Sequence, residues 1–447
     1  MKEIMNSAII LMSLFTVFLA AGCTAQQQLS PDSSIGKTSA FNRTQSSTAW
    51  MTTTKSVSSL PSMTTSAAAS HQATTTSTHR KTYTSPAVKL TTTAKETDMN
   101  TFFNDSVFKK GKDAYGSKSI NILGDSISHG ANAPQIPNDS LIGLLKKSIA
   151  KKYGAYNYGY TSMLFSFDNP SGDYHELHTV TQSKGQWGIG TGEGAGGHLG
   201  FQFYKSLSKD GELIFSIDRN QSEAAKRVKG VYVYYQAGPD QGAFQVQAGG
   251  KVLETINCWR DKTDTCARSS YIPLPSLKGN KVDIQVIKSE NSLPITITGM
   301  AYAENPNMPT IQNYSRSGLQ LIEVSNDVLR SVCQANVLIF ALGFNDAGLQ
   351  ADPVKFKNKI NYVIRSCEAS GAKVVVLDTI WSFNSTKEYY RSELKRLAVE
   401  TGGEYISFTD MYADNPSMIQ DGAHPSVQGH HQIAQRICKR LGIPEVN

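Results

Sequence analysis

The feature of this 447-residue chain that most limits its fold is a change of hydrophobic pattern in the middle of the sequence. On either side of the middle, short apolar runs alternate with segments of helical spacing, as in SINILGDS followed by NDSLIGLLKKSIAKKYG. Uninterrupted apolar strands such as NVLIFAL and KVVVLD are typical of a parallel sheet that helices cover on both faces. We therefore predict a three-layer α/β/α domain with a parallel sheet, built from residues 99–161 and 304–447.

Between residues 162 and 303 apolar and polar residues alternate, and Gly, Pro and Asp mark frequent turns. Segments such as GVYVYYQAG, GAFQVQAGGKVLETI and KVDIQVIK indicate antiparallel strands without long helices between them. This pattern predicts an all-β, jelly-roll-like domain inserted into the α/β domain. The two ends of the insertion must then lie close together, because the host sheet has to close around them.

The first residues indicate export from the cytosol. Residues 1–22 place an apolar run too short for a comfortable bilayer span after Lys2, as in a signal peptide. The sequence AAGC resembles a bacterial lipobox, which implies cleavage before Cys23 and a lipid on that cysteine; an ordinary secretory signal cleaved nearby is the alternative. We expect an exported protein of the bacterial cell envelope, attached to the membrane only by this lipid.

Residues 23–98 are dominated by Ser and Thr and hold few large apolar side chains. Such a segment cannot bury enough surface to offset its ordering entropy, so we expect a disordered tether. The net charge of +7 is spread along the chain without a tight Lys/Arg cluster, which argues against a nucleic-acid groove.

Five cysteines follow Cys23. In an oxidising compartment the close pair Cys258 and Cys266 is the best candidate for a disulfide. Five is an odd number, so at least one thiol is unpaired within the chain; the pairing of the remaining three stays open: Cys333, Cys367 and Cys438. No Cys or His spacing suggests a metal site.

Three short motifs stand where predicted strands end, which is where open parallel sheets place their sites. They are GDSIS at 124–128, GFND at 343–346 and DGAH at 421–424. A serine hydroxyl needs a base held by a third group, and Ser126, His424 and Asp421 supply these three parts. His430 and His431 fall inside the last predicted helix, where packing or capping is the expected role.

Acyl transfer also needs hydrogen-bond donors for the developing oxyanion. The amide of Asn345 and the backbone N–H of Gly318 suit this task. Gly159 also follows a predicted strand and is the alternative to Gly318. Asp125 and Asp346 are expected to bond the loops that hold the site.

These motifs, in this order, resemble the four blocks of the SGNH (GDSL-like) hydrolase superfamily. The resemblance implies Ser126 as nucleophile, His424 as base and Asp421 as its orienting group, without metal or cofactor. It also implies an oxyanion hole made by Ser126 N–H, Gly318 and Asn345.

The inserted β domain is similar to the arrangement in extracytoplasmic carbohydrate O-acetylesterases, including peptidoglycan O-acetylesterases, where the insertion resembles a carbohydrate-binding module. The implied function is removal of O-acetyl groups from peptidoglycan or a surface polysaccharide. An O-acetyltransferase, a lipase or thioesterase, and a non-catalytic polysaccharide-binding lipoprotein are the alternatives.

Aromatic side chains of the insertion could stack on sugar rings, among them Trp259 and the strand residues Tyr232, Tyr234 and Tyr235. Strand alternation places Tyr232 and Tyr234 on the face opposite Tyr235, so at least one of these faces is expected to be core.

Overall fold

The computed structural model describes residues 105–162, 177–190, 195–276, 279–290, 292–381 and 385–445. The predicted signal peptide, Cys23 and the predicted tether lie outside these residues. Within them, no helix combines the length and apolar character needed to cross a bilayer.

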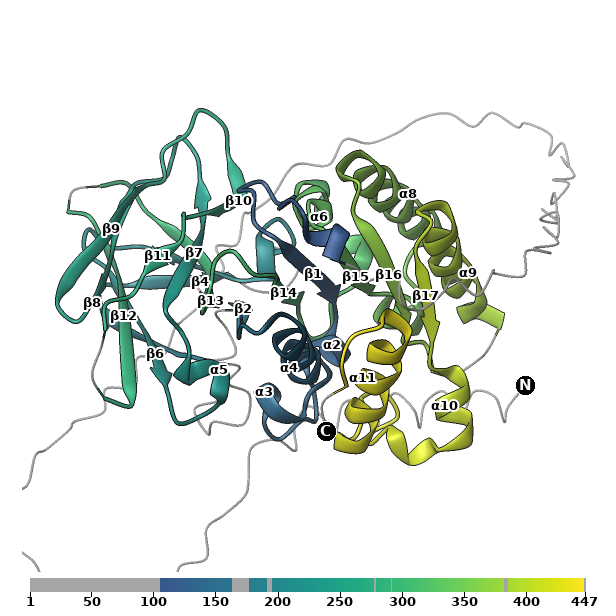
Figure 1. Cartoon of the computed structure of the whole chain (residues 1–447). Coiled ribbons are helices and arrows are strands. Elements are labelled where there is room, and N and C mark those ends of the chain that lie inside the picture. Colours follow the sequence, from purple (N-terminus) through teal and green to yellow (C-terminus); the bar gives the residue numbers. More distant parts are fainter. Residues whose placement is uncertain are drawn as a thin grey trace, which may run out of the picture. The chain divides into compact units, whose positions relative to one another are not determined.

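A parallel sheet forms the centre of the α/β domain, with the strand order β14-β1-β15-β16-β17 among the described residues (Figure 1). β1 (Ser119–Gly124) lies between β14 (Thr310–Ser315) and β15 (Val337–Ala341). β16 (Lys373–Asp378) and β17 (Glu404–Ser407) extend the sheet beyond β15. Both neighbours of β1 come later in the chain, so the strand order reverses at β1, and this is the position where open α/β sheets place their sites.

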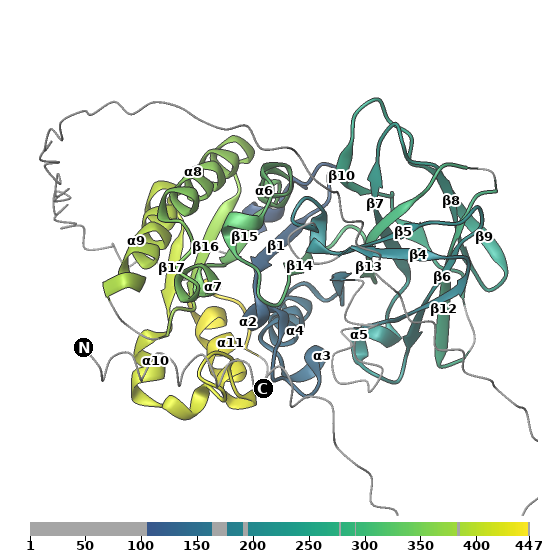
Figure 2. The ribbon, with the colours of Figure 1, turned by 180° about the vertical axis from the view of Figure 1, so that it is seen from behind.

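Helices cover both faces of this sheet, as Figures 1 and 2 show. The two layers are α6 (Asn326–Cys333), α8 (Pro353–Ser370) and α9 (Ser385–Glu400) on one face, and α4 (Leu141–Tyr153) and α11 (Val427–Leu441) on the other. Along β15, Leu338 and Phe340 pack with the first layer, whereas Val337 and Ile339 pack with the second. This alternation is why the strand reads as an unbroken apolar run, and it confirms the predicted three-layer α/β/α fold.

Shorter helical segments lie in the connections. They are α2 (Ser126–His129), α3 (Ile136–Asp139), α5 (Glu223–Lys226), α7 (Phe344–Gly348) and α10 (Thr409–Asp414), with 3-10 turns η2 (Asp105–Phe108), η5 (Leu199–Phe201), η6 (Leu321–Glu323) and η7 (Pro416–Met418).

Two antiparallel sheets form the inserted β domain, as predicted. The first sheet has the strand order β10-β7-β13-β5-β4; in addition, β11 pairs with β7 and β2 pairs with β13. Its strands are β2 (Gly159–Ser162), β4 (Trp187–Gly190), β5 (Phe203–Ser206), β7 (Gly230–Ala237), β10 (Asp264–Arg268), β11 (Ile272–Pro273) and β13 (Thr296–Ala303). In the second, the order is β3-β6-β12-β8-β9: β3 (Thr179–Lys184), β6 (Glu212–Asp218), β8 (Ala243–Ala248), β9 (Lys251–Asn257) and β12 (Lys281–Lys288). Phe215, Val231 and Ile284 belong to the apolar cluster that the two sheets share.

The two ends of the insertion meet through Asn157. Its side-chain oxygen accepts the backbone N–H groups of Glu304 and Asn305, both at 2.9 Å, and its Nδ2 donates to the carbonyl of Asn305 at 2.6 Å. β2 then pairs with β13, so the antiparallel sheet begins at Gly159, ahead of the boundary expected at residue 162. The expectation that the two ends lie close together is confirmed.

The tyrosines of β7 are core residues on both faces of their strand. Tyr232 and Tyr234 pack with the α/β domain, and Tyr235 packs between the two antiparallel sheets; all three are buried. Trp259 differs, with 51% of its surface exposed. Tyr232 and Tyr235 therefore offer no surface on which a sugar could stack.

The predicted Cys258–Cys266 disulfide is wrong, because both thiols are free. Cys258 is buried in the core between the two antiparallel sheets, whereas Cys266 packs against the cluster shared with the α/β domain. The two residues are close in sequence but belong to different cores. Burial raises the pKa of each thiol to about 12. Cys333, Cys367 and Cys438 are free as well.

Candidate active site

Ser126 lies at the turn between β1 and α2, at the carboxyl end of the parallel sheet. Gly124 ends the strand, and a Cβ there would approach the Ser128 hydroxyl oxygen to 1.8 Å, which only glycine avoids. Asp125 caps the short helix, since its Oδ1 accepts the N–H of Ile127 at 3.0 Å. The sharp turn therefore presents the Ser126 side chain at the position where the strand order reverses.

The structure brings Ser126, His424 and Asp421 together. The Ser126 Oγ lies 2.8 Å from His424 Nε2, and the His424 Nδ1 lies 2.7 Å from Asp421 Oδ2. A carboxylate only accepts hydrogen bonds, so we assign the imidazole proton to Nδ1. Nε2 is then left as an acceptor for the serine hydroxyl, which is the arrangement that removes a proton from a nucleophile.

The loop of Asp421 and His424 is held in several ways. Asp421 Oδ1 accepts the backbone N–H groups of Ala423 at 3.0 Å and of His424 at 2.7 Å. Trp381 Nε1 donates to the carbonyl of Ala423 at 2.8 Å, and Asn132 Nδ2 lies 3.4 Å from Asp421 Oδ2. Trp381 and Asn132 were not predicted, because no local pattern links either residue to this loop.

Asp421 is a carboxylate at neutral pH. Partial burial raises its pKa, but the hydrogen bonds from His424 and from two backbone N–H groups outweigh burial and lower the pKa to about 2. The negative charge beside Nδ1 therefore persists while His424 gains and loses a proton.

Gly318 and Asn345 follow the two strands that flank β1: Gly318 lies in the loop after β14, and Asn345 lies in α7 after β15. In the sheet register Gly124 lies opposite both Ser315 of β14 and Ala341 of β15, so the loops that follow these strands start level with the Ser126 turn. Asn345 Nδ2 donates to the carbonyl of Leu319 at 3.2 Å, which joins the two loops. Both loops therefore lie at the same edge of the sheet as the Ser126 turn.

Gly318 and its alternative, Gly159, have similar φ angles of +75° and +77°, and they differ in what a Cβ would contact. Gly318 has φ +75° and open space where a Cβ would stand, so its backbone conformation alone favours glycine. Gly159 starts a strand of the insertion, and a Cβ there would lie 1.7 Å from the carbonyl oxygen of Ile311, near the amino end of β14. Packing explains Gly159, and Gly318 remains the candidate oxyanion donor.

His430 has the capping role expected of it. Its Nδ1 accepts the N–H of Leu141 at 3.2 Å, at the start of α4, and its Nε2 lies 2.9 Å from the carbonyl of Ala131. Burial lowers the pKa of His430 to about 4, so this histidine stays neutral.

Two buried aspartates fix the loops around the site, as expected. Asp125 Oδ1 holds the first turn of α2, while Asp346 accepts the N–H of Leu321 at 2.9 Å and of Ile322 at 3.4 Å. Burial raises the pKa of each carboxyl group to about 7, and the charge of Asp346 adds to the effect at Asp125. Both groups therefore take up protons well above the ordinary range of a carboxyl group.

The raised pKa of Asp125 predicts a pH dependence of stability. An unfolded aspartate titrates near pH ~3.9, so between that pH and about 7 the folded chain binds more protons than the unfolded chain. The free energy of unfolding should then fall as pH rises through this window. Asp125→Asn keeps an acceptor for Ile127 but cannot ionise, and should reduce the fall by at least about 1 kcal/mol.

Urea unfolding of both proteins between pH 4 and 8 measures this effect. Asp352→Asn is the matched control, because Asp352 also caps a helix but is exposed. Equal pH slopes for Asp125→Asn and the wild type would contradict the prediction.

In the part of the chain that the structure describes, no three His, Cys, Asp or Glu side chains are grouped as metal ligands. The hydrogen-bonded set of Ser126, His424 and Asp421 consists of side chains of the chain itself.

Comparisons with known proteins agree with this geometry. Residues 297–432 match the model of the GDSL-like Lipase/Acylhydrolase family. A solved peptidoglycan O-acetylesterase structure matches 77% of this chain and 94% of its own, with 16% identity and a TM-score of 0.52. A family two carbohydrate esterase from Clostridium thermocellum, solved with cellohexaose, matches 57% and 99%, with 12% identity and a TM-score of 0.25. A search of curated protein sequences finds no match.

The family match contains Asn345, Asp421 and His424 and begins after the insertion, which separates Ser126 from them in sequence. The likeness to the O-acetylesterase structure shows that the fold extends over the α/β domain and the inserted β domain together. Residues 297–432 are thus similar to the GDSL-like Lipase/Acylhydrolase family, and the fold of the chain is similar to that of the O-acetylesterase structure.

Proposed function

We propose that this chain is an exported serine esterase that removes O-acetyl groups from a carbohydrate, either cell-wall peptidoglycan or a surface polysaccharide. The observation that carries the proposal is the continuous set of hydrogen bonds from Ser126 Oγ through His424 to Asp421. It leaves a serine hydroxyl paired with a base whose orientation is fixed by a carboxylate.

In the proposed reaction Ser126 Oγ attacks the acetyl carbonyl carbon while His424 Nε2 takes the hydroxyl proton. Asp421 stabilises the imidazolium ion that forms. The oxyanion of the tetrahedral intermediate accepts hydrogen bonds from the Ser126 N–H, the Gly318 N–H and Asn345 Nδ2. Its collapse releases the sugar alcohol, which receives the proton from His424. Water then attacks the acetyl-enzyme while His424 Nε2 takes its proton; the bond to Ser126 Oγ breaks, His424 returns the proton to Oγ, and acetate leaves. Each step uses groups of the chain and no cofactor.

Two observations support an acetylated glycan as the substrate. A solved structure that matches 77% of this chain is that of a peptidoglycan O-acetylesterase. An inserted β domain also borders the α/β domain here, and insertions of this type resemble carbohydrate-binding modules. Acetate release from a panel of O-acetylated glycans, peptidoglycan among them, tests the substrate class.

Ser126→Ala should lower the hydrolysis of p-nitrophenyl acetate by at least about a thousand-fold, because the nucleophile is lost. His424→Gln should have a comparable effect. Steady-state rates and the melting temperature measure loss of chemistry apart from loss of folding. Ser417→Ala, at an exposed serine near the same loop, is the control and should keep full activity. Activity that survives in Ser126→Ala would reject this nucleophile.

The same assays separate the alternative functions. A transferase would release less acetate when a sugar acceptor is added, and acetylated acceptor would accumulate. A lipase or thioesterase would prefer long acyl chains to acetyl. A polysaccharide-binding lipoprotein would bind glycan without turnover.

Asn345→Ala tests the proposed oxyanion hole. Removal of one such donor costs about a hundred- to a thousand-fold in kcat, because the donor acts mainly on the charge of the transition state. We expect this loss with little change in KM for p-nitrophenyl acetate. A rise in KM at unchanged kcat would instead assign Asn345 to substrate binding.

We further propose that the protein is anchored in the cell envelope by lipid on Cys23. The proposal rests on the apolar run and the AAGC sequence that precede the predicted tether. Cys23→Ser should move the protein from the membrane fraction to the soluble fraction and abolish labelling by a clickable fatty acid. Unchanged membrane association and labelling would contradict the anchor.

A further inference from the structure

A polar hollow of about 370 Å³ lies between β10 of the insertion, α6 of the α/β domain and the segment that precedes β1. Its volume falls in the range of small-molecule sites, about 300–1,000 Å³. Ser126, Asp421 and His424 are not among its lining residues. The hollow is therefore separate from the catalytic groups.

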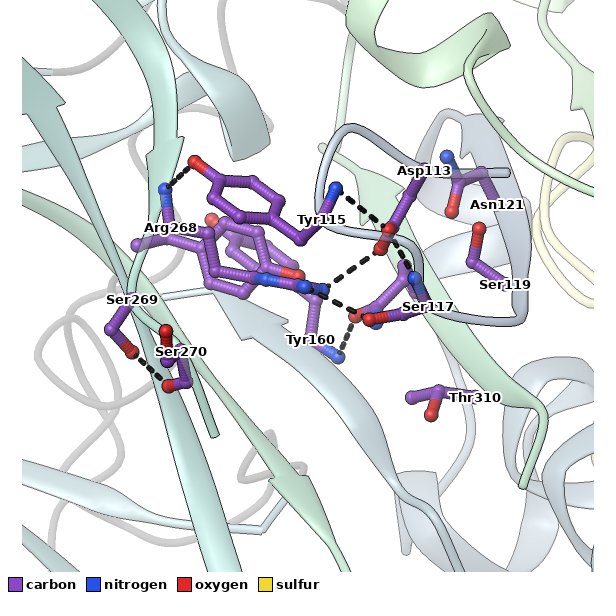
Figure 3. A network of polar contacts seen from close by, with 12 residues as sticks. Asp113, Tyr115, Ser117, Ser119, Asn121, Tyr160, Arg268, Ser269, Ser270 and Thr310 are labelled. Atoms are coloured by element: carbon purple, nitrogen blue, oxygen red, sulfur yellow. Dashed lines mark hydrogen bonds and ion pairs between the residues drawn. The ribbon is translucent and has the colours of Figure 1, made fainter. Parts of the chain in front are cut away.

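Arg268 lines one side of the hollow, and its side chain is held in place by several contacts. Arg268 is buried, and its guanidinium lies 3.0 Å from Asp113 Oδ2 and 2.9 Å from Ser117 Oγ (Figure 3). The guanidinium carbon, Arg268 Cζ, lies 4.4 Å from the ring centres of both Tyr115 and Tyr232. A ligand at this wall meets side chains that are already ordered, so binding there costs little conformational entropy.

Two buried polar atoms among the lining residues have no hydrogen-bond partner within the described part of the chain. Asn121, on β1, is 4% exposed; its Nδ2 donates to the carbonyl of Val332 at 2.8 Å, but its Oδ1 has no partner. Arg268 Nε also has none, although both terminal nitrogens are bonded. These two atoms are themselves buried, and they belong to lining residues on different elements, β1 and β10.

The charges of the lining do not favour an anionic ligand. Asp113 is paired with Arg268, and Asp327 is paired with Arg330 on α6. These pairs leave no excess of positive charge for a phosphate or another polyanion. Asp264 adds a further carboxylate, and the rest of the lining is rich in amides, hydroxyls and tyrosine rings, including Gln334, Ser331 and Tyr314.

Amides and hydroxyls both donate and accept hydrogen bonds, and aromatic rings pack against apolar ring faces. A sugar ring carries both kinds of surface. We propose that this hollow is a second site that binds a neutral saccharide unit, apart from the acetyl group that Ser126 attacks. The inference goes beyond the proposed function, because the hollow contributes no catalytic group and its occupancy can be measured without turnover.

Ser331→Trp tests the proposal by filling the hollow from α6. Binding is measured by titration calorimetry on the full chain, with the neutral tetramers of N-acetylglucosamine and of glucose as probes. Inorganic phosphate and tetragalacturonate are the anionic comparisons. We expect the wild type to bind at least one neutral tetramer, and Ser331→Trp to bind it at least ten-fold more weakly.

Ser366→Trp is the matched control, since Ser366 is a half-buried helix serine of α8 outside the hollow. It should bind like the wild type, and both variants should hydrolyse p-nitrophenyl acetate at the wild-type rate. Gln334→Ala removes a lining amide without adding volume, so it should weaken binding even if Ser331→Trp fails to fold.

Three results would overturn the proposal: no binding of either neutral tetramer at millimolar concentration, equal binding by the wild type and Ser331→Trp, or preferential binding of an anionic probe. Failure of the esterase proposal would be seen separately, as wild-type protein without acetate release.

Discussion

The pairing of β14 with β1 is the constraint on which the rest of the site depends. The chain leaves the α/β domain after α4, builds two antiparallel sheets, and must return as the parallel neighbour of the strand that carries Ser126. Asn157 closes the insertion at its base, and at the far end of β14 the Ser315 and Ser128 hydroxyl oxygens lie 3.0 Å apart. A different register would shift the loop of Gly318 relative to the Ser126 turn, so the pairing that closes the sheet also sets the spacing of the site.

This pairing is also where sequence reasoning reached its limit. GDS is a local signal because it stands at the end of an apolar run. DGAH is a local signal because it places a carboxylate and an imidazole within four residues. β14 was not predicted as a strand, since Gln312 and Asn313 interrupt its apolar residues. The side-chain oxygen of Gln312 accepts the N–H of Tyr160 at 2.6 Å, a partner that only the folded insertion supplies. The strand β14 therefore depends on a contact between segments that are distant in sequence, and the local hydrophobic pattern does not predict it.

The wrong disulfide has a related cause. Cys258 directly follows β9 and Cys266 lies in β10, and these two strands belong to different sheets. Two residues only eight positions apart therefore pack in different cores. The tyrosines of β7 show the complementary case. Their alternation was predicted correctly, but sequence could not reveal that the α/β domain covers the face that carries Tyr232 and Tyr234. In both cases the missing information was what packs against a strand, which periodicity does not contain.

The buried face of β7 bears on the role of the insertion. Tyr160 and Tyr234 of the insertion pack with Tyr314 of β14, with ring centres of Tyr160 at 4.9 Å from each of the other two. Arg268 and Asp113 add a buried ion pair between β10 and the segment before β1. A module attached only by a linker would have to lose rigid-body freedom before it could hold a glycan relative to the serine. Here the folded core has already removed that freedom, so a saccharide bound at the junction would be held at a fixed position relative to the parallel sheet and hence to the turn that presents Ser126.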